Sequence, residues 1–462
     1  MRYIRFNNDG WYARYDDGLN KTNVVRVADA AAARWADVFG GGTVHIGYDT
    51  RRHAPELAAA AAAAVGAWGL DARLSDGPCP MPALNFATRS DPSAVGALML
   101  TADHRNADYL GIRVRNNDSS AIGRDEAGAI EDLVSQELGE AQGPFTLEES
   151  VGPFLAHMAS LVDVRRIRNA RLDCILDPMY GTARGHAATL LRSLGVGVVE
   201  IHGDTVDDFC GTHPEVVEPW LDDLEYMTGQ TQVDFGIAID GPSNRAAAVD
   251  GEGNLVAAPK LHALVLMHLI KNRGLSGRIV LPRFSSVVIR RVAESLGCDV
   301  TLVPPGPTWP FEEIRQGGVI TTSDGLGGIC VPSLDPERNA FVTMLLLVEL
   351  LAYEGVSLRE MAANLDRAVG SMEYGHREIR MDPGRCAVLR NLLPGTNPEG
   401  LCAKKPVSVS HADGLRVQFD DDSWLFIRPS MSEPLVRIYG EGVDRADRDE
   451  LLDMAKSYVT SL

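Results

Sequence analysis

The sequence contains little that would cross-link the chain covalently. Its seven cysteines, at positions 79, 174, 210, 298, 330, 386 and 402, are odd in number and show no C-x-x-C spacing. This distribution argues against a disulfide framework and a cysteine-ligated zinc site. We therefore expect buried free thiols.

Long apolar runs are also missing. No N-terminal segment has the features of a targeting signal, and the alanine-rich stretch 55–69 is too short to span a bilayer. That stretch instead predicts a packed helix. A cytoplasmic protein with no membrane partner is the expectation.

Positive charge is scarce, since 44 Lys and Arg residues stand against 63 Asp and Glu residues and give a formal net charge of -19. Nucleic acids and anionic membranes bind basic surfaces, so neither is expected as a partner. An anionic small molecule would have to meet a local cluster of arginines. The length of 462 residues exceeds what one hydrophobic core supports and predicts about three or four domains.

The stretch RPSMSEPLVR, residues 428–437, has the composition of a phosphate-binding loop. Arg428 and Arg437 offer planar forks of donors that match phosphate oxygens, and Ser430 and Ser432 add hydroxyl donors. Glu433 could orient one arginine from behind. The alternative is an exposed turn with scattered charge.

This stretch resembles the phosphate-binding loop of the α-D-phosphohexomutase superfamily, which includes phosphoglucomutase and phosphomannomutase. The family pattern is R-x-S-x-T-E-P-x-x-R. The resemblance implies three similar α/β/α domains, a smaller fourth domain, and an active site in the cleft where all four meet. Five positions match, and one changes Thr to Ser: Arg428, Ser430, Glu433, Pro434 and Arg437 match, and Ser432 differs.

A repeated strand, loop, helix, glycine and strand pattern agrees with this architecture. The fold class expected is α/β, with three tandem α/β/α domains of mixed sheets and a smaller α+β C-terminal domain around a central cleft. The pattern recurs near 43–76, 171–201 and 277–303, and the predicted domains are 1–150, 151–258, 259–370 and 371–462.

The segment TADHRNADYLGIRV, residues 101–114, resembles the family's catalytic loop T-A-S-H-N-P-x-x-x-N-G-x-K-V. Asp103 stands where family mutases carry a phosphorylated serine, and Arg113 replaces a lysine. The resemblance predicts Asp103, His104 and Arg113 as catalytic residues. Asp103 could be a nucleophile that forms an aspartyl phosphate, a general acid or base, or a fixed charge that imitates phosphoserine. Without the resemblance it would read as a turn or capping residue.

The family's metal loop, D-G-D-x-D-R, is altered to DGPSNR. Asp240 keeps the first carboxylate, but Pro242 and Asn244 replace the other two. Mg²⁺ prefers anionic oxygens in octahedral order, so any site made by Asp240, Asn244 and Asp103 should be weak. We expect no cofactor, or at most weakly held Mg²⁺. Arg245 is retained.

The family's sugar-reading loop, G-E-x-S-G, aligns with Asp324 at the Glu position and Leu326 at the Ser position. In the opening segment, Tyr12 stands where the family has an arginine, and Arg14 follows two residues later. The predicted substrate-binding residues are Asp324, Arg245 and Arg14. A flexible glycine-rich connection is the alternative for the loop at Asp324.

The substitutions at the catalytic serine and at the metal-loop carboxylates fall on parts of the site that depend on one another, because the metal neutralises charge as a phosphoryl group moves. We therefore predict a phosphohexomutase-like protein that binds a phosphorylated sugar or similar organic phosphate, as a monomer or dimer, with non-standard chemistry. The alternatives are a non-catalytic phosphosugar-binding protein and a standard hexose phosphate mutase with unusual loops.

Overall fold

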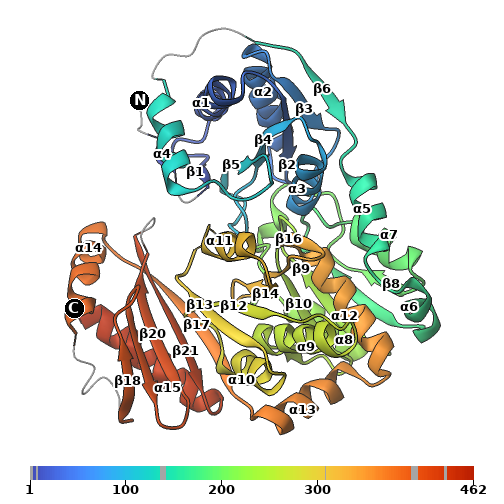
Figure 1. Ribbon diagram of the computed structural model, residues 1–462, viewed down its shortest axis with the longest axis vertical. Helices are drawn as coiled ribbons and strands as arrows, with labels where there is room; N and C mark the ends of the chain where they lie inside the picture. The colour runs from blue at the N-terminus through green and yellow to red at the C-terminus, as the bar shows by residue number, and fades with distance from the viewer. Residues whose placement is uncertain are drawn as a thin grey trace.

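The protein is described by a computed structural model over residues 4–6, 9–135, 142–306, 308–396, 404–430 and 434–461. Four β-sheets follow one another along the chain (Figure 1). Each sheet lies inside one of the four ranges expected from the sequence.

The first sheet has six strands in the order β1-β5-β4-β2-β3-β6. The strands β2, β3, β4 and β6 run parallel, and β5 and β1 run antiparallel to their neighbours. β2 and β4 are buried along their full length, as expected for strands covered on both faces. The elements are β1 (Gly10–Arg14), α1 (Lys21–Phe39), β2 (Thr43–Tyr48), α2 (Ala54–Ala67), β3 (Asp71–Ser75), α3 (Met81–Ser90), β4 (Ala94–Leu100), β5 (Tyr109–Asn116), α4 (Arg124–Leu133) and β6 (Phe145–Glu148).

The second sheet, in the order β8-β7-β9-β10-β11, has two parallel pairs followed by two antiparallel pairs. The strands β3-β2-β4-β5-β1 of the first sheet show the same succession, which confirms the predicted repeat. The elements are α5 (Val151–Ser160), α6 (Val164–Ala170), β7 (Asp173–Asp177), α7 (His186–Ser193), β8 (Gly197–Glu200), η1 (Phe209–Gly211), α8 (Asp222–Gln230), β9 (Phe235–Ile239), β10 (Ala246–Asp250) and β11 (Leu255–Val256).

The third sheet, β13-β12-β14-β15-β16, repeats the succession once more. Helices α9 and α12 contact strands of both the second and third sheets, so these two domains share one hydrophobic core. The elements are α9 (Ala258–Lys271), β12 (Arg278–Pro282), α10 (Val287–Ser295), β13 (Asp299–Val303), α11 (Thr308–Gln316), β14 (Val319–Ser323), β15 (Ile329–Val331), β16 (Asp335–Arg338), α12 (Ala340–Glu354) and α13 (Leu358–Val369).

The fourth sheet, β17-β21-β20-β19-β18, is antiparallel throughout. Side chains alternate along its strands: Leu425 and Ile427 pack in a core with α14 and α15, whereas Trp424 and Phe426 join the core shared by the second and third domains. The elements are β17 (Glu373–Arg380), α14 (Pro383–Leu392), η2 (Leu393–Gly395), β18 (Pro406–Ser410), β19 (Leu415–Phe419), β20 (Trp424–Pro429), β21 (Leu435–Gly442) and α15 (Arg445–Ser461).

Two sequence-based expectations need correction. The stretch 428–437 is not one loop, because Arg428 lies in β20 and Arg437 in β21, where the two residues are partners in the antiparallel register. Strand pairing therefore extends further than the prolines and serines suggested. Cys210 is exposed rather than buried, although the five other described cysteines are buried free thiols. Cys402 lies outside the described residues.

Among the residues that the structure describes, no single helix is long and apolar enough to cross a membrane. The helices α12 and α13 pass that test only as a pair, and they are bent by 84° relative to each other. Most of α12 is buried in the core shared by the second and third domains.

Candidate active site

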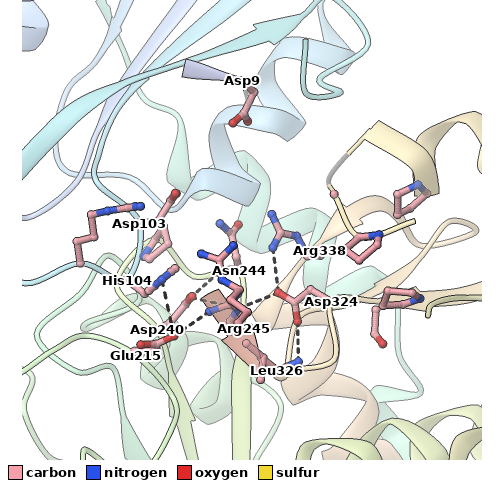
Figure 2. A pocket seen from close by; sticks show the side chains of 18 of the residues that line it. Asp9, Asp103, His104, Glu215, Asp240, Asn244, Arg245, Asp324, Leu326 and Arg338 are labelled. Atoms are coloured by element: carbon pink, nitrogen blue, oxygen red, sulfur yellow. Dashed lines mark hydrogen bonds and ion pairs between the residues drawn. The ribbon is translucent and has the colours of Figure 1, made fainter. Parts of the chain in front are cut away.

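A cavity of about 800 Å³ is lined by residues from all four domains. Figure 2 labels lining residues of the first three domains. It gathers every described residue that the sequence predicted for the site. Ser432 and Glu433, which were also predicted to contribute, lie outside the described residues. The gathered residues are Asp103, His104 and Arg113, Arg14, Asp240, Asn244 and Arg245, Asp324, and Arg428, Ser430 and Arg437.

The cavity provides the local arginine cluster that an anionic ligand would need in a chain of net charge -19. Arginines outnumber the carboxylates that line it. The arginines are Arg14, Arg105, Arg113, Arg115, Arg245, Arg338, Arg380, Arg428 and Arg437, and the carboxylates are Asp9, Asp103, Glu215, Asp240, Asp324, Glu337 and Glu378.

Arg51 holds the loop that follows β4. Its side chain is fully buried, and its Nε donates to Asp49 Oδ2 at 2.9 Å. Its remaining nitrogens donate to four backbone carbonyls, those of Asp103 at 2.7 Å, Arg105 at 2.6 Å, Asn106 at 2.5 Å and Tyr109 at 3.1 Å. A buried guanidinium with this many acceptors fixes the loop backbone strongly.

Asp103 occupies a left-handed backbone conformation with φ of 54°. Its N–H donates to Thr101 Oγ1 at 3.0 Å, and its carboxylate forms an ion pair with Arg113. Arg113 also donates to Asp9 Oδ1 at 2.7 Å, so it bridges two carboxylates. Burial raises the pKa of Asp103, but the charges of Arg113 and Arg105 outweigh it and hold that pKa below its ordinary value. Asp103 is therefore an ionised carboxylate at neutral pH.

His104 lies beside Glu215, with 3.8 Å between His104 Nε2 and Glu215 Oε1. Burial and the nearby charge of Arg245 lower the pKa of His104 well below its ordinary value, so the imidazole is neutral at pH 7. Burial raises the pKa of Glu215 despite the attraction of Arg245. Glu215 was not predicted from the sequence, because its loop carries no pattern that marks it.

Asp240 is almost completely buried, and its Oδ1 accepts the N–H groups of Asn244 at 2.7 Å and Arg245 at 3.0 Å. Burial raises the pKa of Asp240 to about 7, although Arg245 opposes the shift. A proton on this carboxyl is therefore gained and lost near neutral pH.

The donors around Asp240 do not fit the Mg²⁺ ion that the resemblance implies. Pro242 offers only its carbonyl oxygen, which accepts the N–H of Met81 at 3.0 Å. Asn244 Oδ1 is buried without a hydrogen-bond partner, and the Asp103 carboxylate is engaged by Arg113. One carboxylate with a raised pKa and one amide oxygen are a poor ligand set for a hard dication.

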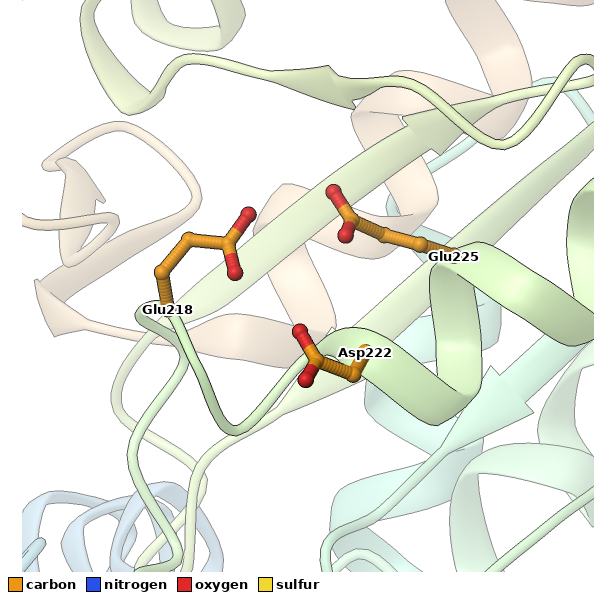
Figure 3. A group of neighbouring side chains, drawn as sticks. All are labelled: Glu218, Asp222 and Glu225. Atoms are coloured by element: carbon orange, nitrogen blue, oxygen red, sulfur yellow. The ribbon is translucent and has the colours of Figure 1, made fainter.

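A separate group of carboxylates lies on the second domain, away from the cavity. Glu218, Asp222 and Glu225 bring one oxygen each within 4.8 Å of the others (Figure 3). Burial raises the pKa of Glu225 to about 7, with repulsion from Glu218 and Asp222 adding to the shift. Glu218 and Asp222 are exposed, and exposed acidic side chains commonly lie together without a metal ion.

Asp324 acts as an internal anchor. Its Oδ1 accepts the N–H groups of Leu326 and Gly328, both at 2.9 Å. Its Oδ2 accepts Arg245 Nε at 2.7 Å and Arg338 at 2.9 Å. Both oxygens are thus engaged by protein donors, so Asp324 reaches a ligand chiefly through the arginines it orients. Arg338 was missed because nothing in β16 marks it.

Arg14 and Tyr12 line another wall of the cavity. Arg14 is partly exposed and pairs with Asp16 at 2.9 Å. The guanidinium of Arg105 lies over the Tyr12 ring, 3.6 Å from its centre, and donates to the Tyr12 hydroxyl at 2.6 Å. Arg105 therefore brings a cation near the position where the family carries its arginine.

The β20–β21 hairpin supplies the predicted phosphate-binding residues. Arg428 lies on the same sheet face as Trp424 and Phe426, and it is the register partner of Arg437. Arg428 donates to the Pro305 carbonyl at 3.4 Å, and Arg437 Nε donates to Glu378 at 2.7 Å. Two guanidinium groups thus come from adjacent strands to one wall of the cavity.

These features define a four-domain α/β protein with a cationic central cavity. Comparison with known families gives three consecutive matches, to phosphoglucomutase/phosphomannomutase α/β/α domain I over residues 4–140, domain II over 152–253 and domain III over 259–368. The chain belongs to this family, within the α-D-phosphohexomutase superfamily.

Individual relatives of this chain support the same family assignment. A protein from Methanopyrus kandleri named as a probable phosphoglucosamine mutase is 26% identical over 98% of each chain. The solved structure of a phosphomannomutase candidate from Thermus thermophilus superposes with a TM-score of 0.89, at 26% identity over 99% of each chain. The N-acetylphosphoglucosamine mutase of Aspergillus fumigatus, solved with GlcNAc-6P and magnesium, shares the fold at a TM-score of 0.61 and 12% identity, over 100% of this chain and 96% of that one.

Proposed function

We propose that the cavity binds a phosphorylated sugar and that the protein converts it by isomerase-type chemistry without a phosphoserine and Mg²⁺ relay. The observation that carries this proposal is the pairing of Arg428 with Arg437 across the hairpin, in the same cavity as an ion-paired Asp103. The arginine pair suits a phosphate group. Asp103, which stands where family mutases have a phosphorylated serine, offers no hydroxyl for their relay.

In this proposal Asp103 is a fixed negative charge that positions Arg113. A carboxylate whose pKa is held low is a weak base, and one oxygen is already bound to a guanidinium. Arg113, oriented by Asp103 and Asp9, would then stabilise negative charge that develops on the sugar.

Proton transfer would fall to Asp240, with His104 beside it. Asp240, with its pKa raised to about 7, can accept or donate a proton near neutral pH. His104 is neutral, and because its pKa is lowered well below its ordinary value it would hydrogen-bond to the ligand rather than hold the proton. Because the donors near Asp240 fit Mg²⁺ poorly, we propose that the reaction proceeds without the metal.

Phosphosugar binding without turnover is the second candidate. It is favoured by Asp324, whose two oxygens already accept four protein N–H donors and leave little capacity for sugar hydroxyls. The names of the relatives suggest glucose, mannose and glucosamine phosphates as the first ligands to try.

The test combines binding and turnover. Isothermal titration with glucose 6-phosphate, mannose 6-phosphate and glucosamine 6-phosphate should reveal a ligand whose binding is weakened in Arg428→Ala and unchanged in Arg359→Ala, an exposed arginine of α13. Phosphorus NMR of the same mixtures, with and without EDTA, should show conversion that survives chelation. Binding without conversion would support the second candidate, and conversion abolished by EDTA would contradict the metal-free proposal.

A further inference from the structure

A second, smaller cavity of about 170 Å³ lies between the third and fourth domains. Arg283, Ser285 and Arg290 line it from the third domain, and Ser410 and Arg416 line it from the fourth. Ser410 and Arg416 are register partners on β18 and β19, so their side chains share one face of the sheet. No acidic side chain of the described residues is among those that line this cavity.

Arg416 carries a charge that its surroundings leave largely uncompensated. Its guanidinium stacks over the Trp424 ring at 4.8 Å and donates to the neutral amide oxygen of Gln418 at 3.0 Å. Its Nε is buried and has no hydrogen-bond partner. Burial, together with repulsion from Arg290, lowers the pKa of Arg416 to about 10.

Ser285 is a second unpaired group at the same place. Its side chain is 9% exposed, and its Oγ is buried without a hydrogen-bond partner. A buried donor without a partner destabilises the folded state. Orphaned donors on both sides of one cavity, from two different domains, are accounted for together if an acceptor-rich ligand lies between them.

Three carboxylates lie near this cavity, and two of them pair with arginines that line it. Asp413 forms an ion pair with Arg283, and Glu294 lies 3.7 Å from Arg290 at the surface. Glu441 accepts the N–H of Val287 at 2.9 Å and Trp424 Nε1 at 2.7 Å. None of the three lines the cavity, so its lining charges are those of the arginines, although Asp413 and Glu294 partly offset Arg283 and Arg290.

We propose that this cavity is a binding site for a phosphate-type oxyanion, distinct from the catalytic cavity. A small side-chain rotation would turn the Arg416 guanidinium and the Ser285 hydroxyl toward its oxygens as donors, and Arg283 and Arg290 would add charge. The space is adequate, since an engineered cavity of about 150 Å³ accommodates benzene. A free phosphate ion and the phosphate group of a small monoester share this chemistry.

The site would also couple to the catalytic cavity. Ser285 and Arg283 face the small cavity, whereas Pro282 and Phe284, which alternate with them along the chain, line the large one. Phe284 stacks on Tyr439 of the fourth domain, with ring centres 4.2 Å apart. An oxyanion bridging Ser285 and Arg416 would therefore hold the fourth domain, with its phosphate-binding hairpin, against the third. This regulatory consequence rests on the proposed function; the site itself does not.

The test uses inorganic phosphate and the full chain. Phosphate titrations are followed by calorimetry in an Arg428→Ala/Arg437→Ala background, which removes the arginine pair of the large cavity. We expect phosphate binding to persist in that background, and to weaken at least tenfold when Arg416→Gln is added and at least threefold when Ser285→Ala is added. Arg359→Ala, added to the same background, should leave it unchanged.

The Ser285→Ala variant keeps the test decisive if Arg416→Gln fails to fold, since it removes only a hydroxyl. Loss of all phosphate binding in the Arg428→Ala/Arg437→Ala background, with its melting temperature retained, would overturn the second site and leave the proposed function standing. Persistent binding that neither Arg416→Gln nor Ser285→Ala alters would also overturn it. Repeating the titration with glycerol 3-phosphate distinguishes a free ion from a monoester.

Discussion

The hairpin of the fourth domain and the loops that follow β4, β9 and β14 form two ends of one site, and they differ in what has been kept. The hairpin keeps both arginines and the register that pairs them. In the loop after β4, Arg51 and Thr101 hold the backbone around Asp103, but the reactive groups of the three loops differ from the family's motifs. Loop geometry and loop chemistry are therefore encoded by different residues, and one can change while the other stays.

The largest expected effect comes from removing Arg51, which holds the backbone of the loop after β4. Arg51→Met leaves four loop carbonyls and Asp49 without their donor, and should lower the free energy of unfolding by about 3–5 kcal/mol. Urea unfolding followed by tryptophan fluorescence measures this. The matched control is Arg52→Met, an exposed neighbour whose loss should cost less than about 1 kcal/mol. Equal effects in the two variants would show that the loop does not depend on Arg51.

The second prediction concerns the β20–β21 hairpin, which carries the pair of arginines. Arg428→Ala should weaken phosphosugar binding by about 10- to 100-fold, equivalent to about 1.5–3 kcal/mol for hydrogen bonds to a charged group. Arg428→Lys should recover only part of the loss, because an ammonium cannot form the paired hydrogen bonds of a guanidinium. Calorimetry compares the phosphosugar affinities of the wild type and the two variants. Full recovery of affinity in Arg428→Lys would indicate that only the charge of the side chain matters.

The third prediction uses the pKa of Asp240. Because that pKa is raised to about 7 in the folded protein from an ordinary 3.8, the folded state holds a proton that the unfolded state releases between about pH 4 and pH 7. The stabilising contribution is complete below about pH 4 and is lost as the pH rises through 7. Asp240→Asn imitates the protonated form and keeps the Oδ1 acceptor.

The Asp240→Asn variant should therefore be more stable than the wild type by about 1–3 kcal/mol at pH 8, with the difference vanishing near pH 4. Thermal melts from pH 4 to pH 8 follow the difference. Parallel melting profiles would mean that Asp240 titrates near its ordinary pKa.

The smallest expected effect is that of Mg²⁺ on the wild type, which should change phosphosugar affinity less than about twofold. The double variant Pro242→Asp/Asn244→Asp restores the family's carboxylates and should gain measurable Mg²⁺ binding by calorimetry. Tight Mg²⁺ binding by the wild type would remove the contrast between the two ends of the site.

The sequence predicts the repeats and the final antiparallel domain well, because apolar periodicity and glycine turns are local signals. It also predicts most of the cavity through loop motifs. It could not predict Glu215 or Arg338, whose roles arise only when separate domains meet. Nor could it show that Asp324 is engaged by two arginines, one 79 residues away. Contacts of that kind follow from tertiary packing and leave no pattern in a single sequence.

The most direct test is the intact mass of the protein after incubation with glucose 1,6-bisphosphate, with and without Mg²⁺, in the wild type and in Asp103→Asn. If Asp103 is a fixed charge, no phosphoryl group is added under any of these conditions, while phosphosugar binding that depends on Arg428 remains. A gain of one phosphoryl group that disappears in Asp103→Asn would contradict this and make Asp103 the nucleophile of a phosphotransfer reaction.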